Sequence, residues 1–154
     1  MKVICLLPDA ALSLAEEQRR KIACILVLVA AADGALVREE ISAIEAAMGA
    51  MMLHPESREE VRQLLTQPPD LESVIDGMEP SAIRIALRDS ALLASVDGDY
   101  DDSELWALRR ICDAGGLSEH ELSMILDWVS DSWKLSASGR SIISTPMPGD
   151  DEIL

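Results

Sequence analysis

A short acidic motif occurs twice in this chain, each time between two segments with the apolar spacing of a helix. Asp33-Gly34 stands seven residues before Glu40, and Asp97-Gly98 stands seven residues before Glu104. Glycine readily takes the left-handed conformation that closes many helices, and each glutamate falls in the first turn of the next predicted helix. The sequence therefore predicts a duplicated helix-turn-helix unit. We call the two Asp-Gly motifs the first and second junctions.

Helix caps and apolar spacing predict seven helices. Serine with glutamate three residues later, a capping box, is expected at Ser13, Ser57 and Ser118, and Pro80 suits a first helical turn. Residues 22–30 are apolar on every face, which indicates a central helix; a buried strand is the competing interpretation, because Ile and Val are common in strands. The predicted helices run from Ser13 to about 32, then 38–52, 55–66, 70–75, 80–96, 102–113 and 118–135.

This pattern predicts the all-α class, as a seven-helix bundle made of two pseudo-symmetric halves. About half of the 154 residues are apolar, enough for the core of one domain. We expect that helical domain at residues 1–135, with Trp106, Trp128 and Trp133 in or at the edge of the core. Residues 136–154 are rich in Ser, Gly, Pro and acidic residues and are expected to form a flexible acidic tail.

The charge and the cysteines restrict the partners and the compartment. A formal net charge of −15 argues against binding to nucleic acid or to an anionic membrane surface, and favours cations and basic protein surfaces. Three cysteines without a CxxC spacing suggest a reducing compartment. The longest apolar run, 22–32, is too short for a bilayer, and we find no secretory signal pattern. We therefore expect a cytoplasmic protein without direct membrane insertion.

Aligning residues 30–45 with 94–109 gives identities at Ala30/Ala94, Asp33/Asp97, Gly34/Gly98, Glu40/Glu104 and Ala43/Ala107. Residues 30–40, AAADGALVREE, resemble the AxADGxxxxxE signature of the TerB-like tellurite-resistance family, and the second junction resembles its repeated half. The resemblance implies an all-helical domain without enzymatic activity, an acidic cluster that holds a metal ion, and assembly with membrane-associated stress-response proteins. Val37 departs from the pattern, since a capping Ser or Asp is expected there.

The residues also give their own reason to expect a cation. Asp33 and Asp97 fall at helix C-termini, where the helix dipole disfavours negative charge by roughly 0.3–1 kcal/mol, so another requirement must select them. Packing of the two halves about a pseudo-twofold axis would bring both junctions together. Carboxylate oxygens suit Ca²⁺ or Mg²⁺. The predicted metal ligands are Asp33, Glu40, Asp97, Asp99, Asp101 and Glu104.

The second junction admits two other interpretations. Asp97, Asp99 and Asp101 match positions 1, 3 and 5 of an EF-hand loop, but Asp102 replaces its glycine and Leu108 its final glutamate, so an EF-hand is not expected. Asp101 and Glu104 also form a capping-box pair that needs no metal. Capping alone and capping with a cation both stay open.

The sequence contains none of the common catalytic signatures. We find no glycine-rich phosphate loop or nucleophile motif, and neither His54 nor His120 has a ligand partner at a recognisable spacing. Together with the resemblance to the TerB-like family, which implies the stress response, this predicts a non-enzymatic helical adaptor in a stress response, with a divalent cation at the junctions. The alternatives are a structural interaction module without metal and, less favoured, a hydrolase that uses the junction carboxylates.

Overall fold

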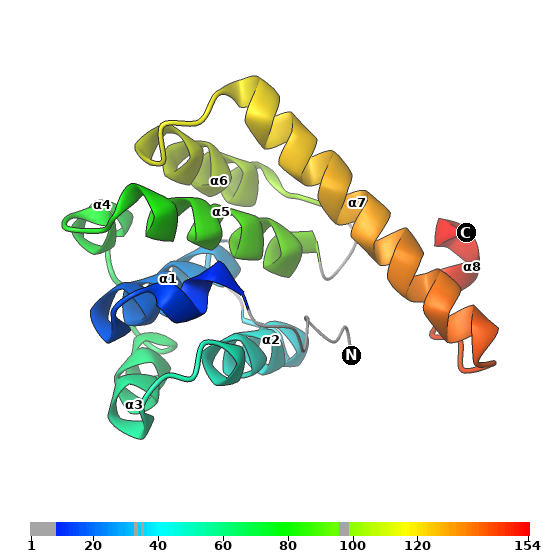
Figure 1. The fold of residues 1–154 in the computed structure, drawn as a ribbon, viewed down its shortest axis with the longest axis horizontal. Helices are drawn as coiled ribbons and strands as arrows, with labels where there is room; N and C mark the ends of the chain where they lie inside the picture. The colour runs from blue at the N-terminus through cyan, green and yellow to red at the C-terminus, as the bar shows by residue number, and fades with distance from the viewer. Residues whose placement is uncertain (1–8, 33, 35, 96–98) are drawn as a thin grey trace.

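The computed structural model describes residues 9–32, 34, 36–95 and 99–154, and the regular elements in these ranges are all helices (Figure 1). The predicted all-α class is confirmed. The described part has eight α-helices where seven were predicted. In chain order the elements are the 3-10 helix η1 (Ala10–Ser13), α1 (Glu16–Ala30), α2 (Arg38–Ala50), α3 (Pro55–Leu64), α4 (Leu71–Ile75), α5 (Pro80–Ala94), α6 (Asp102–Ala114), α7 (Glu119–Ile142) and α8 (Asp150–Ile153).

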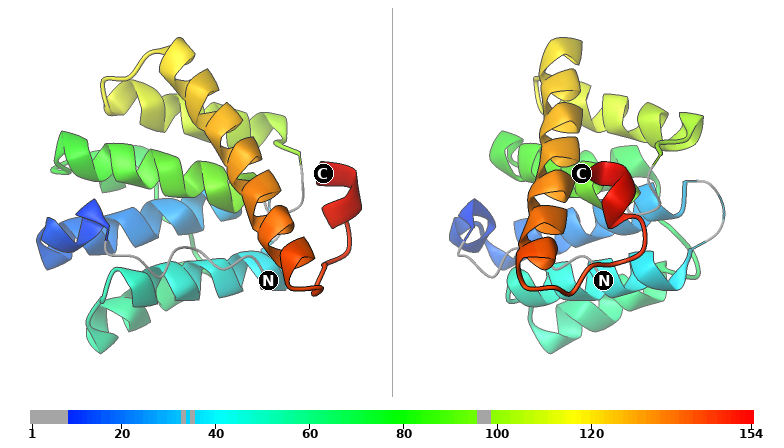
Figure 2. Two further views of the ribbon diagram at one scale, coloured as in Figure 1. Left: turned by 45° about the vertical axis from the view of Figure 1, so that its right-hand side comes forward. Right: turned by 90° about the vertical axis from the view of Figure 1, so that its right-hand side faces the viewer.

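Helix α1 is the centre of the bundle. Its residues 22–30 are buried on every face except at Leu28, which is partly buried. It packs against α2, α3, α4, α5 and α6, most extensively against α5. Figure 2 shows α1 and α5 side by side and running in the same direction. The central helix is thus confirmed, and the competing strand interpretation is wrong.

The short helix α4 confirms the helix predicted at residues 70–75, and a turn at Gly77 follows it. The Asp70 carboxylate accepts the amide hydrogen of Ser73 at 3.1 Å, and Gly77 takes φ +73°. The buried side chain of Gln18 in α1 ties this turn to the core. It donates to the Gly77 carbonyl at 3.0 Å and accepts from the Glu79 amide at 2.8 Å. Gln18 is therefore a satisfied buried amide that fixes the start of α5 against α1.

Two of the three predicted capping boxes are wrong. Ser13 lies in η1, where its hydroxyl donates to the Ala10 carbonyl at 2.7 Å, and the Glu16 carboxylate accepts the His54 amide hydrogen at 2.9 Å. Helix α3 begins at Pro55, so Ser57 lies inside its first turn. The box at Ser118 is confirmed, because the Ser118 amide donates to Glu121 at 2.7 Å and the Glu121 amide donates to the Ser118 hydroxyl at 3.2 Å.

The chain after Ser136 differs from the expected flexible tail. Helix α7 continues to Ile142 with Ala137 fully buried, and α8 folds back against it. The buried Asp150 carboxylate accepts from Arg140 Nε at 2.8 Å and Nη2 at 2.5 Å, and from the Met147 amide at 2.8 Å. This ion pair joins α7 to α8 and holds in place a part of the chain whose composition predicts a flexible tail.

The Arg140–Asp150 pair predicts an effect of pH on α8. Hydrogen bonds from Arg140 lower the pKa of Asp150 to about 2 from its ordinary 3.8. A lowered pKa means that ionised Asp150 stabilises the docked helix above pH 3.8, and that this contribution is lost as the pH falls toward 2. At neutral pH we expect Asp150→Asn to accelerate amide hydrogen exchange in residues 145–154. Exposed Asp151 is the control, and equal exchange in Asp150→Asn and Asp151→Asn would contradict the anchoring role.

A buried hydroxyl in α5 predicts a stabilising substitution. Ser90 is fully buried, and within the described ranges its hydroxyl finds no hydrogen-bond partner. Burying an unsatisfied polar group is unfavourable, so Ser90→Ala should raise the free energy of unfolding by about 1 kcal/mol. Urea denaturation measures it. Ser132→Ala, which removes a hydroxyl that donates to the Val129 carbonyl at 2.7 Å, should give a smaller gain.

Candidate functional site

The two junction glutamates occupy equivalent positions in their helices. Glu40 in α2 and Glu104 in α6 are 7% and 5% exposed, each in the first turn after its junction. The Val37 amide donates to Glu40 Oε2 at 2.9 Å, and the Asp101 amide donates to Glu104 Oε2 at 2.9 Å. Both glutamates therefore cap their own helix. Asp33 and Asp97, the predicted ligands at the helix ends, lie outside the described residues.

The second junction has the more complete cap. Asp101 Oδ1 accepts the Glu104 amide hydrogen at 2.8 Å, a bond that lowers the pKa of Asp101, whereas Val37 has no acceptor to play this part in the first copy. Asp99 is exposed. Within the described ranges no three His, Cys, Asp or Glu side chains gather as a metal site would need. The described geometry thus gives Glu40, Asp101 and Glu104 a capping role, and the cation stays a prediction.

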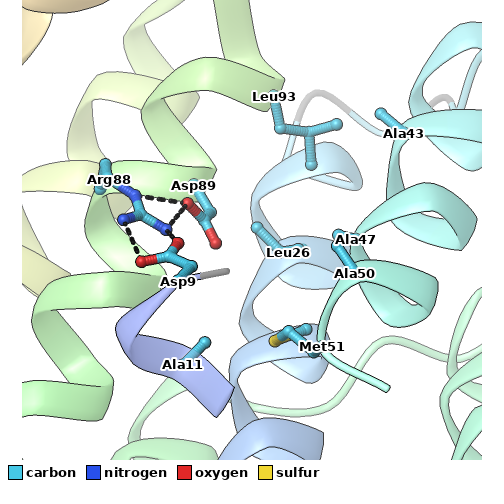
Figure 3. A pocket seen from close by; sticks show the side chains of 10 residues that line it. All are labelled: Asp9, Ala11, Leu26, Ala43, Ala47, Ala50, Met51, Arg88, Asp89 and Leu93. Atoms are coloured by element: carbon cyan, nitrogen blue, oxygen red, sulfur yellow. Dashed lines mark hydrogen bonds and ion pairs between the residues drawn. The ribbon is translucent and has the colours of Figure 1, made fainter. Parts of the chain in front are cut away.

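A hollow of about 50 Å³ lies between α1, α2, α5 and η1, with one charged edge (Figure 3). Four alanines give it a small apolar wall, and Arg88 and two carboxylates form the charged edge. The lining residues are Asp9, Ala11, Leu26, Ala43, Ala47, Ala50, Met51, Arg88, Asp89 and Leu93. This volume suits a few water molecules and is well below the 300 Å³ or more of typical ligand pockets.

Arg88 bridges two carboxylates at this edge. Its Nη1 donates to Asp9 Oδ1 at 3.1 Å, its Nη2 bonds Asp9 Oδ2, and its Nε donates to Asp89 Oδ1 at 2.7 Å. The hydrogen bonds from Arg88 hold the pKa of Asp9 below its usual value. Burial raises the pKa of Asp89 despite the same neighbour. The cluster fastens η1 to α5 across 79 positions of sequence, a pairing for which the sequence gives no local signal.

Helix α7 carries large apolar side chains that face solvent. Trp128, Leu135 and Ile142 recur at every seventh residue and are 47%, 76% and 83% exposed, and Met124, one turn before Trp128, is also exposed. A seven-residue spacing places side chains on one face of a helix, here opposite the buried Leu122, Val129 and Ala137. We call Met124, Trp128, Leu135 and Ile142 the α7 stripe.

The three tryptophans do not share the predicted core position. Trp133 is partly buried against the core, with its indole N–H donating to the Ser95 hydroxyl at 2.6 Å, as expected for a core-edge residue. The prediction is wrong for Trp106 and Trp128, which are exposed. The seven-residue spacing of the α7 stripe was present in the sequence. A helix predicted to end near residue 135 leaves Ile142 in the tail and so does not include the full spacing, whereas α7 continues to Ile142.

Comparison of the chain with protein-family models, with curated proteins and with solved structures finds no match. Within the described residues, none of the helices combines the length and the apolar character needed to cross a bilayer.

Proposed function

We propose that this protein is a non-enzymatic helical adaptor that acts by holding another protein at the α7 stripe. The observation that carries the proposal is the exposure of Trp128, Leu135 and Ile142 along one face of the longest helix. Single exposed apolar residues are ordinary on soluble proteins, whereas an aligned set marks an interaction surface. Burial of such a side chain contributes about 1.5–3 kcal/mol. A partner therefore gains substantially by covering several of them.

The stress context of the proposal comes from the resemblance of the two junctions to the TerB-like signature. We propose a body of two pseudo-symmetric halves, one containing α1 and α2 and the other α5 and α6, with a divalent cation, Ca²⁺ or Mg²⁺, bound at the junctions. The matching positions of Glu40 and Glu104 and the parallel course of α1 and α5 support the duplication. The cation would adjust the adaptor, and the α7 stripe would make the protein contact.

Site-specific photocrosslinking in the native host tests the adaptor function. A photoreactive amino acid at Leu135 should give a discrete adduct with another protein, and its yield should rise under tellurite stress. The same group at Glu56, exposed in the first turn of α3, is the control and should give no such adduct. Absence of an adduct at Leu135, or identical patterns at both positions, would overturn the proposal.

A further inference from the structure

The partner chemistry can be read from the charges around the α7 stripe. We propose that the α7 stripe receives a basic amphipathic helix of another protein, with apolar residues on one face and Lys or Arg along its edges. This inference rests on the proposed adaptor function and adds the class of partner to it.

Carboxylates border the first half of the α7 stripe, which consists of Met124 and Trp128. Glu121 lies three residues before Met124, Asp127 three residues after it, and Asp131 three residues after Trp128, so helical spacing places all three beside the stripe. All three side chains are exposed. From residue 111 to 133 the sequence has no Lys or Arg. Arg84 lies near Glu121 and Lys134 pairs with Asp131, so these two cations offset part of the charge. The three carboxylates still leave the border of Met124 and Trp128 with a net negative charge, which complements a positively charged partner.

The second half of the α7 stripe, Leu135 and Ile142, lacks such a border of carboxylates. Lys134 Nζ lies 3.3 Å from Asp131 Oδ1, and the Arg140 guanidinium forms an ion pair with the Asp150 carboxylate. No Asp or Glu occurs between residues 132 and 149. The partner helix should therefore place its basic residues opposite Met124 and Trp128, and only apolar contact is needed opposite Leu135 and Ile142.

The shape of the surface selects a helix as the occupant. Side chains repeated every seven residues form a straight seam that a second helix can follow, and the distance from Trp128 to Ile142 corresponds to about 21 Å of helix. A partner segment of about four turns with apolar residues at the same period would cover it. Trp128 supplies the kind of aromatic anchor that dominates many interfaces.

A second copy of this chain fits the surface less well. Each copy has a formal net charge of −15. A parallel pairing of two α7 helices would also bring Glu121, Asp127 and Asp131 near the same residues of the second copy, whereas an antiparallel pairing is opposed by the net charge alone. Net charge far from zero keeps proteins apart in solution. Charge complementarity therefore favours a basic helix over self-association.

Two synthetic peptides of about 18 residues provide the probe. Both carry leucines at a heptad period, and the remaining positions are lysine in one and glutamate in the other. Fluorescence anisotropy of the labelled peptides should show binding of the lysine peptide and none of the glutamate peptide. Leu135→Ser should weaken binding by about tenfold, because it removes one buried apolar contact. Leu135 is exposed, so the variant should stay folded.

A charge-matched pair of variants separates the bordering carboxylates from the overall charge. Asp127→Asn with Asp131→Asn should weaken binding of the lysine peptide about fivefold or more at low salt, and much less at 0.5 M salt, because exposed charges are screened. Glu56→Gln with Glu59→Gln removes the same charge from exposed positions on α3 and should leave affinity unchanged. Equal losses in both double variants would mean general attraction to an acidic protein and would overturn the proposal.

Sedimentation velocity of the protein alone examines the competing occupant. A concentration-dependent dimer that Leu135→Ser abolishes would assign the α7 stripe to a second copy and overturn the basic-helix proposal. If the Leu135 crosslink forms in cells but the lysine peptide fails to bind, the adaptor function stands and the partner class is wrong. If neither occurs, both proposals are overturned.

Discussion

Replacing Arg88 with methionine is expected to lower the free energy of unfolding by about 2–3 kcal/mol, because it leaves the carboxylate of Asp89 in a largely buried position without its cationic partner. Asp89 is 15% exposed and Arg88 31% exposed at the side chain, so the loss should fall below that of a fully buried ion pair. The link between η1 and α5 through Asp9 disappears with the same substitution. Urea denaturation followed by circular dichroism measures the change.

A second substitution shows whether the stranded carboxylate causes the loss. Arg88→Met combined with Asp89→Leu removes both charges, and should recover at least half of the stability lost in the single variant. Asp9→Asn alone should cost less than about 1 kcal/mol, since Asp9 is 40% exposed and exposed ion pairs contribute little. If the double variant is less stable than Arg88→Met, the stability comes from packing of the Arg88 stem and this explanation is wrong.

The stability of the Arg88→Met variant should show a characteristic pH dependence. Burial already raises the pKa of Asp89, and removal of Arg88 leaves that effect unopposed. A pKa raised above the unfolded value means that the folded state holds the proton more tightly, so stability is retained at low pH and falls as the pH rises through the folded pKa. The difference between wild type and Arg88→Met should therefore be larger at pH 7 than at pH 4.

Local signals in the sequence predicted the parts of the fold that local chemistry determines. Asp70 and Gly77 bound α4 through contacts within a few residues, and the Ser118 box opens α7 for the same reason. The predicted box at Ser13 failed because Glu16 bonds the His54 amide, 38 residues away. A capping signal therefore predicts a helix start only where tertiary contacts do not take its side chains.

The candidate site residues show the same difference between local contacts, which the sequence predicts, and long-range contacts, which it does not. Capping by Asp101 and Glu104 spans three residues, and the capping-box pair in the sequence predicts it. The Asp9–Arg88 contact joins residues 79 positions apart, and nothing near either residue indicates it. The sequence does not predict the exposure of Trp128, because an apolar residue type alone does not indicate which face of its helix the bundle covers.

Substitution of the junction glutamates is expected to have the second large effect on stability. Glu40→Ala or Glu104→Ala should each lower the free energy of unfolding by about 1–2 kcal/mol, because the amide of Val37 or Asp101 loses the carboxylate that accepts its hydrogen. Glutamine keeps an oxygen acceptor of the same reach, so Glu40→Gln and Glu104→Gln should each cost less than about 0.5 kcal/mol. Thermal and urea denaturation in the presence of EDTA measure the cap without any cation.

Titration with Ca²⁺ and Mg²⁺ then separates the cap from a cation site in the same variants. A bound cation stabilises the folded protein by about 2.7 kcal/mol at a hundred times its Kd, so the proposal expects heat and a higher unfolding temperature for the wild type. Glu104→Gln and Asp97→Asn should lose both responses while Glu104→Gln keeps its stability in EDTA, because a neutral amide caps a helix but binds a hard cation poorly. Absence of heat from the wild type would leave Glu40 and Glu104 as caps alone, and any control by a cation would have to be withdrawn from the proposed adaptor.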